Sequence, residues 1–542
     1  MSSDAPSPDA AASATSDEVA EAGAVSADAA AESRLSGNRD GGIATWIEPG
    51  HAPARSARLA VETIETVLTA LVLAFIFRAF FIEAFIIPTG SMAESLRGEH
   101  RTLACRDCGC EFDVGALTPD ERSGAGGAMV AADGPPTCPS CHRVYEGALP
   151  PTRPGDRILV HKWPFELGGF FGPRPWDVIV FRDPADARQN YIKRLIALPG
   201  EDVEIIDGDV FVNGRIRRKT PAAQRVLWFP VHDQRFVPAL HREGEPHSPW
   251  EPAAYADDPG GGWSGLDTRV VHYASRDARR RALDFAPGGV GPYHQDFYAY
   301  NGGPAGTHVG DLAVSALLRF QSERGELRVQ IERRRLRFTA VLRPDGGVEL
   351  QLASADGENG RTVAMSACSA LREGGSAEFR LEHLDWRVRL TINGCAVLEV
   401  PESDYPISLD AARESAGLGA RLRLEAADTA LELRALRVER DVHYTTNQAR
   451  TRRAMPGQAF ELYSGEYFVV GDNSPHSHDS REWSMVGPHL RHDYYEDRYR
   501  LGTVREDQIV GRAFFVYLPG VVPMDSSGRW RMLDMGRVRM IR

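Results

Sequence analysis

One apolar stretch near the N-terminus decides what kind of protein this chain can form. Residues 64–77 read IETVLTALVLAFIF, and after Arg78 the apolar character continues as AFFIEAFII. A helix of about 20 mostly apolar residues crosses the hydrocarbon core of a bilayer. The three charged residues of the stretch lie toward its ends, where long side chains reach the membrane interface. We therefore expect one transmembrane helix over roughly residues 61–82, within a segment 59–87 that leads to the rest of the chain. A buried or interfacial helix is the alternative.

The residues before this stretch indicate its orientation. Arg55 and Arg58 precede it, and basic residues are enriched at the cytoplasmic ends of membrane helices. We predict a single-pass protein of a cell membrane, with a cytoplasmic N-terminus and all later residues on the extracytoplasmic side. Residues 1–55 begin with about 40 residues that nearly lack large apolar side chains. Such a segment buries too little surface to fold, so we expect a disordered cytoplasmic tail.

Composition excludes two classes of protein. Lys and Arg total 63 against 75 Asp and Glu, which gives a formal net charge of −12. A general nucleic-acid binder needs a basic surface, so no nucleic-acid partner is expected. Seven cysteines in 542 residues are too few for a small fold held together by disulfide bonds.

The chain beyond the apolar stretch has the pattern of a mostly β protein. Short apolar runs fill residues 155–215, where Asn213–Gly214 is a hairpin-turn signal. The block 219–455 opens without a clear period, but from about residue 310 apolar residues alternate with polar ones, and Asn393–Gly394 marks a second turn. Many evenly spaced strands of this kind indicate a jelly-roll-like β-sandwich, with its core at about 305–440.

Three short motifs contain residue types suited to nucleophilic catalysis. Ser91 follows a glycine in the turn-forming sequence PTGSM, Lys193 lies in the apolar run YIKRLIALPG, and Ser477 lies in GDNSPHSHDSR. Burial disfavours a charged ammonium and lowers the pKa of a lysine. The neutral amine can then take the proton of a serine. Taken singly, each motif also has an ordinary interpretation: a loop serine, a solvated lysine and a surface loop.

In their order after a membrane helix, and together with GDRILV and DVIVF, these motifs resemble type I signal peptidase (leader peptidase). Members of this family are membrane-anchored endopeptidases with a Ser/Lys dyad. The resemblance covers about residues 60–104, 150–218 and 456–520, which is less than half of the chain. It implies an antiparallel β catalytic domain in three parts: 88–104, 150–218 and, with the C-terminal tail, 456–542.

The resemblance also implies a role for each matched residue. Ser91 would be the nucleophile and Lys193 the general base. Ser477 would hydrogen-bond the lysine amine and orient it. The backbone N–H of Ser91 and the hydroxyl of Thr89 would hold the oxyanion, and no catalytic cofactor would be needed.

Further matched positions imply support and substrate pockets. Asp479 and Arg481 would brace the loop that bears Ser477. Pockets for small side chains, one and three residues before the scissile bond, would be lined by Phe85, Ile87, Met92, Leu96 and Ile192. The implied activity is the removal of N-terminal signal peptides from exported preproteins at the surface of membrane lipid. Two alternatives are a Ser/Lys protease with one or few dedicated clients, and an inactive membrane scaffold.

The sequence departs from the family pattern in several places. Glu94 stands where the family usually has a proline, which changes the turn but no catalytic atom. His476 and His478 flank Ser477, and we interpret them as solvated loop residues that could otherwise modulate the pH dependence. Two large insertions interrupt the family pattern.

The first insertion, residues 105–147, holds two C-x₂-C pairs about 30 residues apart. Four thiolates with this spacing suit tetrahedral Zn²⁺, and the segment resembles a zinc ribbon. We expect a structural zinc bound by Cys105, Cys108, Cys138 and Cys141. Cys110 and His142 are plausible substitutes for one ligand. Disulfide bonds are the alternative, since the segment would face an oxidising compartment, and Cys368 and Cys395 could pair as well.

The second insertion is the β-sandwich block at 219–455. It loosely resembles concanavalin-like or laminin-G-like jelly rolls. Such folds bind glycans or proteins, and they also serve as spacers. A glycan or protein ligand of the sandwich is therefore an open expectation.

Overall fold

The computed structural model describes residues 55–116, 135–141, 143–163, 169–238, 248–253, 262–286, 293–357, 360–445, 453–519, 521–523 and 531–541. The tail expected at residues 1–55 lies outside these residues except for Arg55, and His142 also lies outside them. Strands dominate the described residues, which confirms the mostly β prediction.

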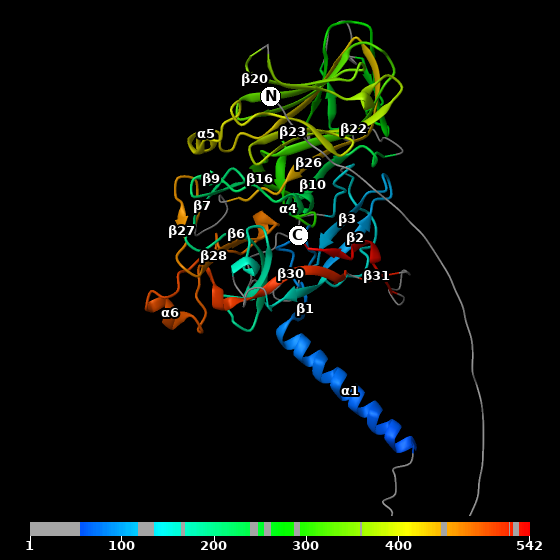
Figure 1. Cartoon of the computed structure of the whole chain (residues 1–542). Coiled ribbons are helices and arrows are strands. Elements are labelled where there is room, and N and C mark those ends of the chain that lie inside the picture. Colours follow the sequence, from blue (N-terminus) through cyan, green and yellow to red (C-terminus); the bar gives the residue numbers. More distant parts are fainter. Residues whose placement is uncertain are drawn as a thin grey trace, which may run out of the picture. The chain divides into compact units, whose positions relative to one another are not determined.

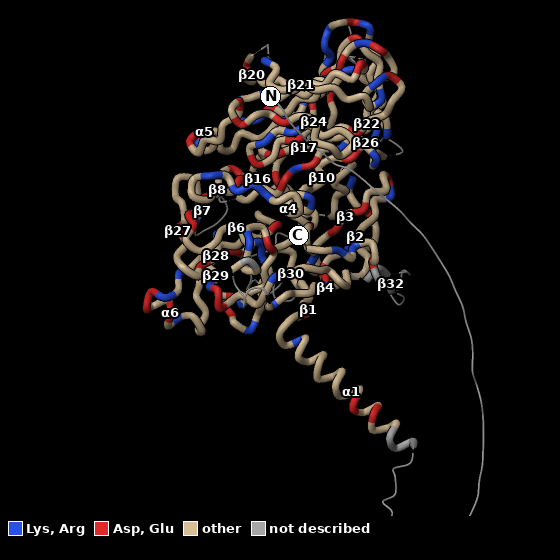
Figure 2. The backbone as a smooth tube through the Cα atoms, viewed as in Figure 1, with Lys and Arg blue, Asp and Glu red and all other residues tan. Residues whose placement is uncertain are grey.

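The apolar stretch forms helix α1 (Arg55–Phe80). Its portion Leu59–Phe80 has a mean hydropathy of 2.0 and no buried residues, so the helix is long and apolar enough to cross a membrane. Figure 2 shows its charged residues toward the two ends. The helix ends before residue 82 because Ile82–Ile86 forms strand β1, which pairs with β4 (Arg157–His161). The chain divides into two compact units, Met1–Leu68 and Thr69–Arg542, and the boundary lies within α1. All elements described next belong to the second unit.

An antiparallel sheet of eight strands is assembled from distant parts of the chain (Figure 1). Its order is β1, β4, β30, β5, β6, β28 and β29, with β33 beside β30. Strand β30 (Ile509–Leu518) thus lies between the pair β1–β4 and the pair β5 (Val178–Arg182) and β6 (Asn190–Ala197). The other strands are β28 (Glu466–Val470), β29 (Val504–Arg505) and β33 (Arg539–Met540).

A smaller antiparallel sheet packs against this one. Its strands, in spatial order, are β27 (Phe460–Glu461), β7 (Asp202–Ile206), β8 (Asp209–Val212) and β9 (Arg215–Ile216). Asn213 and Gly214 have φ values of 50° and 72° between β8 and β9, the left-handed pair of a tight hairpin. The predicted turn is therefore confirmed. Ile205 of β7 and Phe468 of β28 belong to one hydrophobic core shared by the two sheets.

The second insertion contains two large antiparallel sheets that share one hydrophobic core. The eight-stranded sheet comprises β12 (Trp263–Ser264), β13 (Val270–Ser275), β26 (Thr429–Asp441), β17 (Leu312–Phe320), β22 (Ser376–Leu384), β23 (Arg387–Ile392) and β24 (Cys395–Glu399), with β10 (Trp228–Asp233) beside β26. The seven-stranded sheet comprises β11 (Trp250–Pro252), β14 (Arg281–Phe285), β25 (Arg421–Ala427), β18 (Glu326–Arg333), β19 (Leu336–Leu342), β20 (Gly347–Ser354) and β21 (Arg361–Ala367).

The alternating residues predicted from position 310 onward do fill this core. Leu318 of β17 and Ile331 of β18 are buried in it, as is Leu390 of β23. The two sheets, however, begin earlier than the alternation indicated, because β10 to β14 already contribute strands. These strands are short and are anchored by aromatic residues such as Trp250 and Tyr273, so they show no sustained period.

The remaining elements are short. Antiparallel hairpins are formed by β2 (His100–Ala104) with β3 (Glu111–Gly115), β15 (Gln295–Phe297) with β16 (Pro304–His308), and β31 (Val521–Pro523) with β32 (Arg531–Leu533). The short α-helices are α4 (Pro221–Val226), α5 (Leu409–Glu414) and α6 (Arg491–Tyr495). Single 3₁₀ turns occupy Gly169–Phe171, Ser369–Leu371, Ser474–His476, Glu506–Gln508 and Met535–Arg537.

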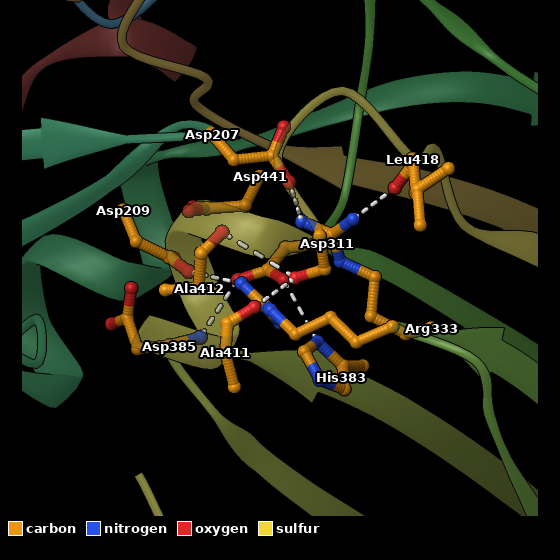
Figure 3. A network of polar contacts seen from close by, with 12 residues as sticks. Asp207, Asp209, Asp311, Arg333, His383, Asp385, Ala411, Ala412, Leu418 and Asp441 are labelled. Atoms are coloured by element: carbon orange, nitrogen blue, oxygen red, sulfur yellow. Dashed lines mark hydrogen bonds and ion pairs between the residues drawn. The ribbon is translucent and has the colours of Figure 1, made fainter. Parts of the chain in front are cut away.

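A buried ionic network joins the insertion to the smaller sheet. Arg333 ends β18 and Arg334 follows it in the hairpin turn to β19, and Figure 3 shows Arg333 reaching Asp207 beside β7. Arg334 Nη2 lies 2.6 Å from an oxygen of Asp209 at the start of β8. All four side chains are nearly inaccessible to solvent. Breaking a buried pair on one side leaves an uncompensated charge, so this network fixes the insertion to the sheet.

Candidate active site

Ser91 and Lys193 meet although they are 102 residues apart in the chain. Lys193 lies on β6, and Ser91 lies in the turn that follows β1. The Nζ atom of Lys193 is 2.6 Å from the Oγ atom of Ser91. This is hydrogen-bond distance, so a neutral amine here is placed to accept the serine proton.

The turn that carries Ser91 is packed against the second insertion. It is closed by hydrogen bonds from the N–H of Ala93 to the carbonyl of Gly90 (3.0 Å) and from the N–H of Leu96 to that of Met92 (2.8 Å). A Cβ atom on Gly90 would lie 2.5 Å from the ring of Tyr300, which belongs to the insertion. Only glycine therefore fits before the serine. Tyr300 also accepts a hydrogen bond of 2.7 Å from the N–H of Gly98.

The environment of Lys193 favours the neutral amine. Only 3% of the residue is exposed, and burial lowers the pKa of its ammonium from 10.5 to about 8. The carboxylates of Asp479 and Asp472 oppose this shift, and the guanidinium of Arg481 adds to it. Desolvation outweighs the attraction of the carboxylates. A significant share of the amine is therefore uncharged near neutral pH.

Ser477 lies beside the reacting pair, but it does not hydrogen-bond Lys193 as the resemblance implied. Its hydroxyl is buried and has no partner of standard hydrogen-bond geometry among the described residues, but its interaction with the carboxylate of Asp479 helps to lower the pKa of that group. A Cβ atom on Gly471 would lie 2.2 Å from Ser477 Oγ and 2.5 Å from the carbonyl oxygen of Ser91. The close packing of the two serines therefore depends on the missing side chain at position 471. The orienting role of Ser477 stays a prediction.

Asp479 and Arg481 form a fully buried ion pair within the loop that bears Ser477. Arg481 donates from Nε to one oxygen of Asp479 (2.8 Å) and from Nη2 to the other (2.6 Å). Its Nη1 donates to the carbonyl of Thr445 (2.6 Å), and Asp479 accepts from the N–H of Gly471 (2.9 Å). Burial raises and Arg481 lowers the pKa of Asp479, with a net lowering. The pair thus holds the loop in one conformation.

The two predicted oxyanion donors are free to bind an external group. Thr89 is exposed. Neither its hydroxyl nor the backbone N–H of Ser91 makes a hydrogen bond within the described part of the chain. Their role in binding an oxyanion remains a prediction.

A second buried ion pair connects the two reacting segments, and the sequence motifs did not reveal it. Arg194, next to Lys193, donates through Nε and Nη2 to the two oxygens of Asp472, both at 2.7 Å. Asp472 also accepts a hydrogen bond from the hydroxyl of Ser95, in the turn that carries Ser91. Asn473 adds a bond from Nδ2 to the carbonyl of Gly90 (3.1 Å). An arginine within an apolar strand was the available signal, because such a side chain needs a buried partner.

The five predicted pocket residues belong to one hydrophobic cluster. Three of them are almost inaccessible to solvent, and two are half-buried against the same cluster. The buried ones are Ile87, Met92 and Leu96, and the half-buried ones are Phe85 and Ile192. The buried residues can form the floor of a pocket, and the half-buried ones can form its wall.

Four of the seven cysteines cluster at metal-binding distance. The sulfur atoms of Cys105 and Cys141 are 3.6 Å apart, as are those of Cys108 and Cys138, and all four lie within 4.8 Å of one another. All seven cysteines are free thiols. The pairing of Cys368 with Cys395, which the sequence left open, is therefore not formed. Cys368 precedes a 3₁₀ turn beside Gly346, whereas Cys395 opens β24 in the other sheet.

The comparisons with known proteins point to one family. Residues 140–227 and 388–518 match the model of the family described as signal peptidase, peptidase S26. Curated relatives include a signal peptidase I of Pseudomonas fluorescens, 36% identical over 76 residues (14% of this chain, 24% of the relative). Another is a probable signal peptidase I-1 of Synechocystis sp., 38% identical over 77 residues (13% of this chain, 38% of the relative). The chain thus covers well under half of the length of either relative.

Among solved structures, two proteins of Bacillus subtilis are similar to part of the chain. One is the carbohydrate binding module CBM66, with 10% identity and a TM-score of 0.23 over 36% of this chain and 96% of that one. The other is a protein of unknown function with a galectin-like fold, with 12% identity and a TM-score of 0.24 over 36% of this chain and 90% of that one.

Proposed function

We propose that this chain, whose matched segments belong to the type I signal peptidase family, is a membrane-anchored serine endopeptidase that removes N-terminal signal peptides from exported preproteins. One observation carries the proposal. The Nζ atom of the buried Lys193 lies 2.6 Å from the Oγ atom of the half-buried Ser91. A neutral amine replaces the histidine of the usual triad as the base.

The reaction would pass through an acyl-enzyme. Lys193 takes the proton of Ser91 while Oγ attacks the scissile carbonyl, and the Ser91 N–H and the Thr89 hydroxyl stabilise the oxyanion. The protonated Lys193 then gives its proton to the leaving amine, and the C–N bond breaks. Lys193 next activates a water molecule, which hydrolyses the ester and frees Ser91.

The substrate would be a membrane-inserted segment that ends in small residues one and three positions before the cleaved bond. Helix α1 would anchor the enzyme, with its N-terminus in the cytoplasm and the sheets on the extracytoplasmic side, where translocated preproteins emerge. Lipid around α1 and the signal peptide itself would be the partners of this part of the chain.

A cleavage assay tests the proposal. The full chain, purified in detergent, is offered a preprotein with an Ala-x-Ala site, and the product is identified by mass spectrometry. We expect cleavage after the second alanine by the wild type and none by Ser91→Ala. Equal cleavage by Ser91→Ala would refute the mechanism, and a wild type that cleaves nothing would favour an inactive scaffold.

The pH dependence of kcat/KM should reveal the pKa of Lys193. Because the base is the neutral form of Lys193 and its pKa is about 8, kcat/KM should rise about tenfold per pH unit below neutrality and level off above about pH 9. Asp183 is one of the carboxylates that raise this pKa, so Asp183→Asn should move the inflection to lower pH. An inflection near 10 would show a solvated lysine instead.

We further propose that the four clustered cysteines bind a structural zinc ion. In a tetrahedral zinc site with Zn–S bonds of about 2.3 Å, neighbouring sulfur atoms are about 3.8 Å apart, which fits the observed 3.6 Å. A disulfide would need about 2.05 Å. The residues present thus fit zinc, and four thiolate ligands would leave no open position for catalysis.

Metal analysis of the full chain should find about one zinc per molecule. Removal of zinc by a chelator should lower the melting temperature, because Phe236 of the second insertion packs on the cysteine cluster. The double variant Cys105→Ser/Cys138→Ser should lose the metal, whereas Cys368→Ser should keep it. A metal-free protein whose four cysteines react with thiol reagents only after reduction would show disulfides instead.

A further inference from the structure

A cavity of about 980 Å³ lies where the serine-bearing turn meets both insertions. Ala93, Glu94 and Arg97 of the turn line it, together with Asn473 of the loop at 471–481. Most of the remaining wall comes from the cysteine segment and the sandwich block. None of the five predicted pocket residues lines this cavity. A polypeptide bound to Ser91 could therefore occupy the predicted pockets with one end and this cavity with the other.

The wall combines aromatic rings with an excess of negative charge. Among the described lining residues, six are carboxylates and four are arginines, and one of the carboxylates, Asp472, is paired with Arg194 outside the wall. Three of the arginines are already neutralised by carboxylates within the wall, at 2.6, 2.5 and 2.9 Å: Arg97–Asp113, Arg235–Asp233 and Arg440–Asp296. Aromatic rings such as Phe112, Phe229 and Tyr298 also line the cavity. Aromatic faces and carboxylates both attract cations.

Glu94 is a carboxylate of the turn with no basic side chain at ion-pair distance, although Arg440, Arg97 and Arg537 act on it from farther away. It makes no hydrogen bond or ion pair with any described residue, and its side chain is accessible from the cavity. Desolvation, followed by the nearby Asp113, raises the pKa of its carboxyl. Across the cavity, Oδ2 of Asp296 is buried and lacks a hydrogen-bond donor. A buried carboxylate oxygen without a donor, such as Oδ2 of Asp296, is costly unless a cation or donor arrives.

The position of Glu94 in the chain limits how far from the cleaved bond a substrate residue that contacts it can lie. It is three residues after Ser91, so the two Cα atoms are at most about 11 Å apart. An extended peptide advances about 3.4 Å per residue. A substrate residue that meets Glu94 is therefore about two to four positions from the cleaved bond.

We propose that the cavity receives the polypeptide that follows the scissile bond, and that Glu94 selects a basic side chain about two to four residues beyond it. This inference rests on the proposed peptidase function. It makes the two insertions part of a specificity site on the leaving side of the substrate. Glu94 is a specificity residue and takes no part in the chemistry.

The test measures charge preference. Preproteins with one Ala-x-Ala site carry Lys, Ala or Glu at each of the first five positions after the cleaved bond, and kcat/KM is measured for each. At one of positions two to four, we expect the wild type to prefer Lys over Ala by about tenfold, the size of one charge-assisted hydrogen bond. Glu94→Gln should bring this ratio near one, and Glu94→Lys should favour the Glu substrate. Glu99→Gln, in the same loop but outside the cavity, should keep the wild-type ratio.

A binding measurement separates this inference from the proposed function. Fluorescent peptides of eight residues that begin at the cleaved bond, with Lys or Ala at the preferred position, are titrated against Ser91→Ala and Ser91→Ala/Glu94→Gln. Tighter binding of the Lys peptide only when Glu94 is present supports the cavity even if no cleavage is found. Cleavage without charge preference, or a preference that survives Glu94→Gln, overturns the inference while the peptidase function stands. Equal binding of a free alkylamine and the Lys peptide would show a small-cation site instead.

Discussion

Replacement of Lys193 by methionine should abolish cleavage without unfolding the protein. Met has a similar length but no amine, so Ser91 loses its base, and we expect kcat to fall by about 10⁴ or more. The same change should stabilise the fold at neutral pH. Burying a lysine whose pKa falls from 10.5 to about 8 costs roughly 3 kcal/mol, and methionine removes that cost. Thermal unfolding and the preprotein assay, run on one preparation, measure both effects.

The pH dependence of stability gives the control. In the wild type the folded pKa of Lys193 lies below the unfolded one, so the native state binds fewer protons between about pH 8 and 10.5. The free energy of unfolding should therefore rise with pH in that window. The Lys193→Met variant should lack this rise. A variant that is less stable than the wild type at pH 7, or that still cleaves, would contradict the assignment.

Replacement of Lys219 by methionine should have the opposite outcome. Its Nζ lies 2.6 Å from Asp385 and 2.7 Å from Asp441, with all three side chains almost fully buried. These carboxylates outweigh desolvation and raise the pKa of Lys219. Loss of the amine leaves two buried carboxylates unpaired, so we expect a loss of about 3–5 kcal/mol of stability. Denaturant unfolding measures it.

The chain offers its own comparison, because it contains only three lysines. Lys162 is the third and pairs with Glu83 at 2.9 Å with both side chains partly exposed. Such pairs contribute about 0–1 kcal/mol, so Lys162→Met should change stability little. If Lys219→Met is as mild as Lys162→Met, the ion pairs of Lys219 with Asp385 and Asp441 do not hold the insertion in place. The kcat of the Lys219→Met molecules that remain folded should equal that of the wild type. This result would show that Lys219 takes no part in the chemistry.

The reacting pair was predicted through the resemblance of several motifs, taken together and in order, to type I signal peptidases, because each local pattern alone also fitted a loop serine or a solvated lysine. The apolar neighbours of Lys193 allowed a buried amine, and the glycine before Ser91 allowed a tight turn, but neither pattern decided the matter. The long strands of the second insertion could also be predicted. Each packs one face against the core, so apolar and polar residues alternate along it. Patterns of this kind need no knowledge of which segments are neighbours in space.

What the sequence did not predict depends on contacts between distant segments. The Arg194–Asp472 pair spans 278 residues, and Tyr300 packs on Gly90 from 210 positions away along the chain. No spacing rule connects such residues. The strands from Trp228 to Phe285 were missed for a related reason: their order comes from neighbouring strands such as β26, to which β10 and β13 pair.

The central place of β30 determines when the enzyme would become active during synthesis. In the eight-stranded sheet, the serine follows β1, which pairs with β4, the lysine lies on β6, which pairs with β5, and β30 joins β4 to β5. A nascent chain that already contains both reacting groups would therefore still lack the strand that aligns them. The proposed peptidase activity would therefore begin only after residues 509–518 had been made.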